Sequence, residues 1–153
     1  MMTSRVLIRA DASSKIGTGH VMRCLGLAQQ LRLSGYEVAF ALAVANQGVL
    51  SRLRSESFDC EMIEAVPASD DDLAVTREIC VRRNISLLIV DGYQFHGNWL
   101  RDVRIGGCRI MLWTDYLQDV SLPVDIILDQ TPAANAADYR AICPHGIILA
   151  GLN

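Results

Sequence analysis

One short stretch of the chain holds the side chains best suited to chemistry, because a histidine there follows two closely spaced glycines. Gly17 and Gly19 precede His20, and Arg23 follows one helical turn later. Glycine lets the backbone approach a ligand closely, and N–H groups at a helix start can face an anion or a sugar hydroxyl. The positive end of the helix dipole disfavours a protonated imidazole and keeps a neutral base available. We interpret the stretch as a ligand site with His20 as its general base; the alternative is a histidine that only begins a helix.

The glycine spacing differs from that of the common phosphate-binding loops. The stretch lacks the G-x-x-x-x-G-K-[ST] pattern of nucleotide triphosphatases, and Met22 stands where G-x-G-x-x-G requires its third glycine. The chain has no G-x-S-x-G turn, and no two of its histidines have metal-ligand spacing. His96 and His145 are isolated, and we expect both at the surface or in loops. The pattern indicates sugar chemistry rather than a nucleotide cradle, without a metal or a cofactor.

The elements that must position this stretch alternate along the chain, as short apolar runs and longer helical patterns. That alternation is typical of a parallel sheet with helical crossovers. We expect seven strands, at residues 5–9, 37–43, 60–63, 86–90, 109–113, 124–128 and 147–149. Between them, apolar spacing predicts helices over residues 21–31, 48–57, 70–83 and 98–105, while residues 131–141 give no clear pattern. The predicted fold is a Rossmann-like, doubly wound α/β domain that covers residues 1–153.

Polar side chains recur where the predicted strands end. Asp11 follows the first strand, Asp91 and Tyr93 the fourth, Asp115 the fifth and Asp129 the sixth. Ligands of open α/β sheets bind at the carboxyl ends of the strands, so these residues are expected to border a crevice with His20. A single aspartate in such a place is as often only a helix N-cap.

An acidic triplet, Asp70 to Asp72, follows Ser69. Serine is a preferred N-cap, and acidic residues in the first turn complement the helix dipole. A metal site is the alternative. We expect a solvated first turn of a helix.

The composition excludes several classes of partner. The chain has a net charge of −3, which gives no electrostatic reason to bind nucleic acid or an anionic membrane. No apolar run approaches the roughly 20 residues of a membrane span, and we expect no signal peptide before the first strand. The cysteines are scattered without metal-like spacing and are expected to be reduced thiols, mostly small buried hydrophobes: Cys24, Cys60, Cys80, Cys108 and Cys143. We therefore expect a cytoplasmic protein.

The glycine-rich stretch belongs to one longer pattern, Arg9-x-Asp11-x-Ser13-x-x-Ile16-Gly17-x-Gly19-His20-x-x-Arg23-Cys24-Leu25-x-Leu27-Ala28. This pattern resembles the N-terminal signature of the UDP-2,4-diacetamido-2,4,6-trideoxy-β-L-altropyranose hydrolase family. These are nucleotide-sugar hydrolases of pseudaminic acid biosynthesis, and related spore-coat polysaccharide proteins share the signature. Shorter segments agree with the family in order along the chain: Val90-Asp91-Gly92-Tyr93, Asp115, Asp125-Ile126-Ile127-Leu128-Asp129-Gln130 and Leu149-Ala150-Gly151.

The resemblance implies a chemistry as well as a fold. Members are similar in fold to the two-domain, MurG-like (GT-B) glycosyltransferases, and they hydrolyse a UDP-linked amino-deoxy sugar at its anomeric carbon, releasing UDP without a metal. It implies that His20 is the base that activates the attacking water. It also implies two sets of substrate contacts, a set that shapes the sugar side of the cleft and a lesser, orienting set: Asp11, Ser13, Gly17, Thr18 and Gly19, then Tyr93 and Asp115.

Two departures from the family pattern leave other functions open. Thr114 replaces the first aspartate of the family's Asp-Asp pair. The chain stops at Asn153, near the family's interdomain connection, so we expect an N-terminal half without the C-terminal nucleotide-binding domain. A GT-B glycosyltransferase and a non-catalytic, truncated or binding module are the alternatives. We also expect self-association through the apolar face that a second domain would cover.

Overall fold

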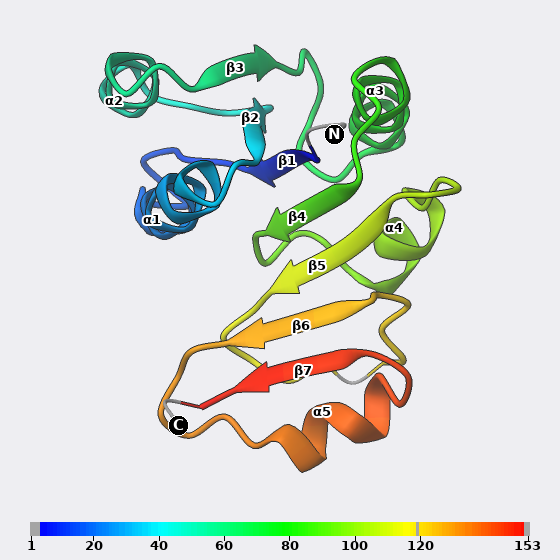
Figure 1. Cartoon of the computed structure of the whole chain (residues 1–153). Coiled ribbons are helices and arrows are strands. Elements are labelled where there is room, and N and C mark those ends of the chain that lie inside the picture. The colour runs from blue at the N-terminus through cyan, green and yellow to red at the C-terminus, as the bar shows by residue number, and fades with distance from the viewer. Residues whose placement is uncertain (1–3, 119, 152–153) are drawn as a thin grey trace.

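Seven parallel strands form one sheet, in the order β3-β2-β1-β4-β5-β6-β7 (Figure 1). The computed structural model describes residues 4–118 and 120–151; Asn153, on which the expected domain boundary rests, lies outside the described residues. The strands are β1 (Arg5–Ala10), β2 (Glu37–Leu42), β3 (Asp59–Met62), β4 (Leu87–Asp91), β5 (Arg109–Trp113), β6 (Ile126–Asp129) and β7 (Ile147–Ala150). The helices are α1 (Gly19–Leu33), α2 (Gln47–Ser55), α3 (Asp70–Arg82), α4 (Gly97–Asp102) and α5 (Ala136–Ile142).

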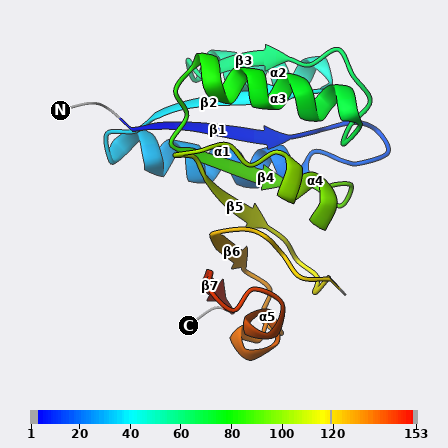
Figure 2. The same ribbon diagram turned by 90° about the vertical axis from the view of Figure 1, so that its right-hand side faces the viewer.

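The helices pack on both faces of the sheet, as the views in Figures 1 and 2 show. On one face, α1 and α2 cover β1 and β2 with side chains such as Val21, Leu25 and Leu53. On the other face, α3, α4 and α5 contribute side chains such as Ile79 and Leu100 to a second apolar cluster. This three-layer arrangement confirms the predicted fold class and explains why the central strands are mostly apolar.

All strands are parallel, but the order in which they are added across the sheet reverses between β1 and β4. From β1 the chain moves outward to β2 and β3, and from β4 it moves the opposite way to β7. The two central strands pair in register, with Ala10 opposite Asp91 at their carboxyl ends. Such a reversal point is where open α/β sheets bind ligands.

The predicted elements agree with the structure to within a few residues at their ends. The unassigned stretch 131–141 contains most of α5, which Asn135 caps by accepting a hydrogen bond from the Ala137 amide. The fourth predicted helix is shorter than expected and ends at Asp102. Ser69 caps α3 as predicted, since its hydroxyl accepts from the Asp72 amide at 3.2 Å.

The prediction of a fully solvated acidic turn is wrong for Asp72. Its side chain is buried and receives two hydrogen bonds from Arg9, at 2.9 and 2.7 Å. The hydroxyl of Thr76 and the amide of Ala68 also donate to it. Arg9 lies inside β1 with its guanidinium fully buried, and a buried cation is stable only when it is paired and hydrogen-bonded. Asp72 therefore belongs to the protein interior, where it fastens α3 to the sheet.

One region of the sheet lacks a covering helix in the described part of the chain. Ile147 and Leu149 lie opposite Ile126 and Leu128 in the β6–β7 register, on the same face as α1 and α2. The crossover helix α5 packs against the other face. Ile147 and Leu149 are consequently 54% and 49% exposed.

No helix in the described ranges has both the length and the apolar character that a membrane span requires.

Candidate functional site

The glycine-rich stretch lies at the reversal point of the sheet. β1 ends at Ala10, the loop of residues 11–18 follows, and α1 begins at Gly19. His20 is thereby the second residue of the helix and is largely buried. Because β4 runs beside β1, the end of β4 meets the first turn of α1 and brings Asp91 to the histidine.

Asp91 is the centre of a compact polar cluster. Its Oδ1 lies 2.6 Å from Nδ1 of His20 and 2.5 Å from Nη2 of Arg23. Its Oδ2 accepts from Nε of Arg23 at 2.6 Å and from the Cys24 thiol at 3.4 Å. The carboxylate is fully buried, so these donors replace its water shell.

The geometry fixes which nitrogen of His20 carries hydrogen. An ionised carboxylate can only accept, so the 2.6 Å contact assigns the hydrogen of the neutral ring to Nδ1. Nη2 of Arg23, 3.2 Å from the same nitrogen, is also a donor and does not hydrogen-bond to that tautomer. The lone pair is left on Nε2, which is the nitrogen able to take a proton from water or a hydroxyl. The same carboxylate would stabilise the imidazolium formed by that transfer.

Tyr93 and Asp115 lie on the other side of the histidine. The Tyr93 ring meets the His20 ring edge-on at 4.9 Å between centroids, and its hydroxyl donates to Oδ2 of Asp115 at 2.9 Å. Arg23 links the two carboxylates, since its Nη1 is 3.6 Å from Asp115 and its guanidinium lies over the Trp113 ring. The structure thus brings together three of the predicted site residues, His20, Tyr93 and Asp115.

Charge and burial shift several pKa values in this cluster. Burial alone would raise the pKa of Asp91, but the hydrogen bonds from Arg23 and His20 outweigh burial and bring that pKa below its ordinary value. The hydrogen bond to Asp115 raises the pKa of Tyr93, with a smaller contribution from burial. Burial and the nearby Asp91 raise the pKa of the Cys24 thiol well above its ordinary value. At neutral pH, Asp91 is therefore ionised, and Tyr93 and Cys24 are protonated donors.

The remaining loop residues form a turn of their own beside the helix start. The Ser13 carbonyl accepts from the Gly17 amide at 2.7 Å, and the Ser13 hydroxyl accepts from the amides of Lys15 and Ile16. Gly17 has φ +80°, a conformation that favours glycine. Nothing lies within 4 Å of the place where a side chain of Gly19 would begin. Gly17 and Gly19 are exposed, so the loop presents its backbone to solvent at the site.

Thr18 precedes α1 as its N-cap but makes no side-chain cap hydrogen bond. Its own carbonyl accepts from the Met22 amide at 3.0 Å. The first N–H groups of α1 therefore receive no acceptor from Thr18, which leaves them suited to a ligand oxygen.

Asp11 lies beneath the loops rather than on the surface of the site. Its Oδ1 accepts from Arg9 at 2.8 Å and from the Ala43 and Val44 amides, and its Oδ2 accepts from Gln94. The side chain is fully buried. These contacts join the ends of β1 and β2 to the loop that carries Tyr93, so Asp11 can influence the site through that loop.

Asp91 was expected to border a crevice with His20, and Arg23 was noted one helical turn after it. Their direct pairing with each other and with His20 was not predicted, because it depends on how β4 meets α1. Thr114 bonds within its own loop, where its hydroxyl donates to the Tyr116 carbonyl. The Asp129 carboxylate accepts hydrogen bonds from the hydroxyl groups of Thr131 and Tyr139, away from the His20 cluster.

The cluster is closely packed. The side chains around His20, Asp91 and Tyr93 leave no cavity that a small molecule could enter. A substrate would therefore lie against the outer surface of the cluster. Among the described residues, no group of three or more His, Cys, Asp or Glu side chains is placed to hold a metal ion.

The fold is that of a Rossmann-like α/β domain, with the His20 cluster at the carboxyl ends of its parallel strands. A crystal structure of Acinetobacter baumannii MurG matches 98% of this chain with a TM-score of 0.63, at 14% sequence identity and over 46% of the MurG chain. A curated relative from Campylobacter jejuni, a UDP-2,4-diacetamido-2,4,6-trideoxy-β-L-altropyranose hydrolase, is 25% identical over 141 residues. That match covers 92% of this chain and 46% of the relative, so the chain spans about half the relative's length. No family model matches the chain.

Proposed function

We propose that this chain carries the catalytic base of a nucleotide-sugar hydrolase, which cleaves a UDP-linked amino-deoxy sugar at the anomeric carbon and releases UDP. The observation that carries the proposal is the 2.6 Å contact between Asp91 and Nδ1 of His20, which leaves Nε2 as the base. In this mechanism Nε2 removes a proton from water while the water oxygen attacks the anomeric carbon. The bond from that carbon to the diphosphate oxygen breaks, and UDP leaves with the electron pair.

The charge of the cluster supports the proposal that the sugar, rather than the diphosphate, binds at this surface. Arg23 contributes one positive charge against the two carboxylates Asp91 and Asp115, so the cluster is net negative while His20 is neutral. A negative cluster stabilises the positive charge that develops at an anomeric carbon during cleavage. It repels a diphosphate. We therefore assign the anomeric carbon to this surface. We assign the uridine diphosphate contacts to a second domain, because the relative and MurG are each about twice as long as the part that this chain matches.

The loop residues would complete the sugar-binding surface. The exposed turn at Ser13, Gly17, Thr18 and Gly19 would contact sugar hydroxyl or amide groups through its backbone. Tyr93 would orient the sugar from the other side of His20. Asp11, which is buried, would support the surface rather than touch the sugar.

A glycosyltransferase is the second candidate, because the chain matches the MurG structure in fold and the family that it resembles is similar in fold to the MurG-like glycosyltransferases. The same base would then deprotonate a sugar hydroxyl in place of water. Isotopic water separates the two activities, since hydrolysis places the water oxygen in the sugar product. Transfer gives no labelled sugar and requires an acceptor.

The test uses the UDP-sugar that names the Campylobacter jejuni relative, in water labelled with heavy oxygen. The chain is assayed alone and combined with the remaining half of that relative. We expect UDP release with the label in the sugar, and loss of at least about a hundredfold in rate on His20→Asn, the usual contribution of a general base. Label in UDP would indicate attack at phosphorus, and a His20→Asn variant with unchanged turnover would rule out the base. His96→Asn, an exposed histidine at the start of α4, is the matched control and should retain full activity.

A further inference from the structure

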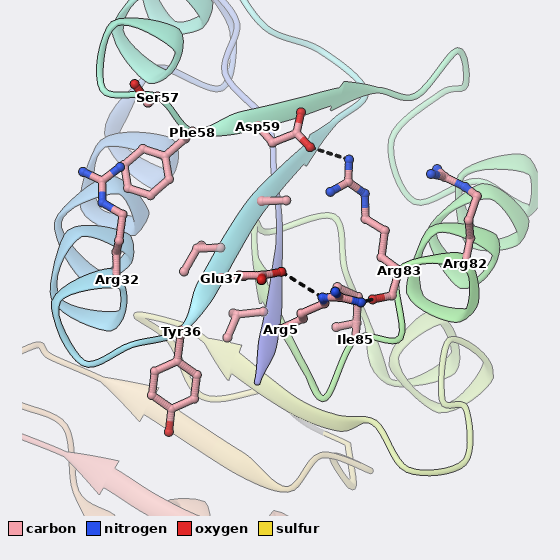
Figure 3. A pocket seen from close by; sticks show the side chains of 13 residues that line it. Arg5, Arg32, Tyr36, Glu37, Ser57, Phe58, Asp59, Arg82, Arg83 and Ile85 are labelled. Atoms are coloured by element: carbon pink, nitrogen blue, oxygen red, sulfur yellow. Dashed lines mark hydrogen bonds and ion pairs between the residues drawn. The ribbon is translucent and has the colours of Figure 1, made fainter. Parts of the chain in front are cut away.

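A concave region lies at the edge of the sheet opposite the His20 cluster, at the amino ends of β1, β2 and β3 (Figure 3). This concave region exists because β2 begins two residues before its pairing with β3. β2 begins at Glu37, but β3 pairs with it only from Ala39 onward, where Ala39 lies opposite Asp59. The outer side of β2 is therefore open over its first two residues. The resulting cavity measures about 570 Å³, which is within the usual size of small-molecule sites.

The lining of this cavity combines an apolar floor with a cationic rim. The floor consists of apolar side chains from the strands and their connections: Val6, Val38, Ala39, Phe58 and Ile85. Four arginines and two carboxylates line the rim: Arg5, Arg32, Arg82 and Arg83, with Glu37 and Asp59. The chain as a whole is acidic. Glu61 also pairs with Arg82 and Arg83, so the four arginines exceed the carboxylates around them by one charge. The rim is thus a weakly positive region on an acidic chain, and it would attract an anion.

Two of the arginines are held in fixed orientations on the rim of the cavity. Arg5 donates through Nε to Glu37 at 2.8 Å and through Nη1 to the Arg83 carbonyl at 3.2 Å. Arg83 donates through Nη2 to Asp59 at 2.5 Å and through Nε to Glu61. A guanidinium has five N–H donors, so these partners orient each fork and leave further donors for a ligand. The ordering entropy of these side chains is already spent in the free protein, which favours binding.

A third arginine forms the opposite wall, as Figure 3 shows. The guanidinium of Arg32 lies 4.2 Å from the centroid of the Phe58 ring and donates to the Glu56 carbonyl. Within residues 4–118 and 120–151, no carboxylate lies within salt-bridge distance of Arg32. Arg32 therefore adds positive charge to this wall of the cavity, away from Arg5 and Arg83.

From this arrangement we infer a binding site for a small organic anion, whose phosphate or carboxylate group meets Arg5 and Arg83. The apolar part of the ligand, about one ring in size, lies on Val38 and Ile85. β1 separates the cavity from the His20 cluster by the length of a six-residue strand, roughly 20 Å. The inference is consequently independent of the function proposed for that cluster.

Titrations followed by amide NMR test the inference with four probes: phenyl phosphate, benzoate, inorganic phosphate and phenol. We expect phenyl phosphate or benzoate to cause saturable shifts at Val38, Ala39, Phe58 and Ile85, and the tighter of the two identifies the preferred anionic group. Arg5→Gln should weaken that binding by about tenfold, the usual value of a charge-assisted hydrogen bond. Arg5 is about half exposed, so the substitution should leave the fold intact.

Arg101→Gln is the matched control, because Arg101 is an exposed arginine on α4 that pairs with its neighbour Asp102. This variant should bind phenyl phosphate and benzoate as tightly as the unmodified chain does. Three results would overturn the inference. These are no saturable shifts at the cavity, equal binding by inorganic phosphate or phenol, and equal weakening by Arg5→Gln and Arg101→Gln.

Discussion

At the scale of single residues, Asp91 determines the chemistry of the candidate site. It selects the tautomer of His20, neutralises Arg23 and accepts from Cys24, all from a fully buried position. A histidine without this carboxylate could carry hydrogen on either nitrogen. Under the proposed function, the carboxylate therefore acts as a positioning group for the base, through a short contact that the first turn of α1 makes with the end of β4.

Asp91→Asn should destabilise the protein by about 3 kcal/mol at neutral pH, because the partly buried Arg23 loses its closest counter-charge and keeps only Asp115, at 3.6 Å. The loss should depend on pH. The pKa of Asp91 is lowered by folding, so its stabilising contribution is complete above the ordinary value of 3.8 and disappears as pH falls through the lower folded value. Denaturant unfolding of both proteins from pH 7 down to the acid limit of folding measures this.

The difference in unfolding free energy between the two proteins should shrink below pH 3.8. Asp102→Asn, at an exposed carboxylate that pairs with Arg101, is the control and should cost little at any pH. A loss for Asp91→Asn that is equally large in acid and at neutral pH would contradict the assigned ion pair.

Tyr93 offers a second measurement at this scale. Its hydroxyl donates to Asp115, which raises the pKa of Tyr93 above the ordinary value of 10.0. Ultraviolet titration of the chain against a Tyr93→Phe variant isolates this phenol from the other tyrosines. Asp115→Asn should bring its ionisation back toward 10.0, since the carboxylate that opposes the phenolate is gone. An unchanged difference titration would show that Asp115 does not hold the hydroxyl in solution.

At the scale of elements, the connection from β1 into the first turn of α1 contains two glycines with different roles. Gly17 has φ +80°, so Gly17→Ala should cost about 1–2 kcal/mol of stability through backbone strain. Gly19 is the first residue of α1, with open space around it, so Gly19→Ala should leave stability within about 0.5 kcal/mol.

Under the proposed function, Gly19→Ala should instead weaken binding of the UDP-sugar, because the added methyl group occupies the approach to the loop backbone. Thermal unfolding and substrate titration of both variants separate the two effects. Equal loss of stability from both substitutions would show that Gly19, like Gly17, is needed for folding rather than for a ligand.

The elements were more predictable from the sequence than their contacts. Apolar periodicity located the strands and most helices, because burial of one face decides where they form. The contacts of Arg9 with Asp72 and of His20 with Asp91 join residues 63 and 71 positions apart. Only the register of β1 against β4 and the packing of α3 bring them together. An arginine within an apolar strand was the one local signal that a buried acidic partner existed.

At the scale of the whole molecule, the two edges of the sheet have opposite character. The carboxyl edge holds the compact, net negative cluster around His20, whereas the amino edge holds the cavity with its arginine rim. The His20 cluster leaves no cavity, whereas the amino edge has an open cavity of about 570 Å³. A ligand at the His20 edge therefore needs a further surface to enclose it, which fits a chain that spans about half of its curated relative.

The uncovered face of β6 and β7 should make the isolated chain self-associate. Ile147 and Leu149 are about half exposed, and they continue an apolar strip formed by Ile126 and Leu128. Two copies that bring these strips together would remove both from water, with a gain of about 25 cal/mol per Å² of apolar surface. Sedimentation across a wide concentration range should show a dimer that dissociates on dilution. Replacing both exposed residues by lysine should weaken it at least about tenfold, because charges would be buried at the contact.

Leu33→Lys is the matched control for this last prediction. Leu33 is the most exposed large apolar side chain in the described residues, at 81%, and it lies at the end of α1, which covers other strands. If exposed apolar surface of any kind drives association, Leu33→Lys will weaken the dimer as much as the paired substitution in β7. If the strip is the contact, Leu33→Lys will leave the dimer unchanged. A chain that remains monomeric at the highest concentrations would show that two copies of this face do not fit each other.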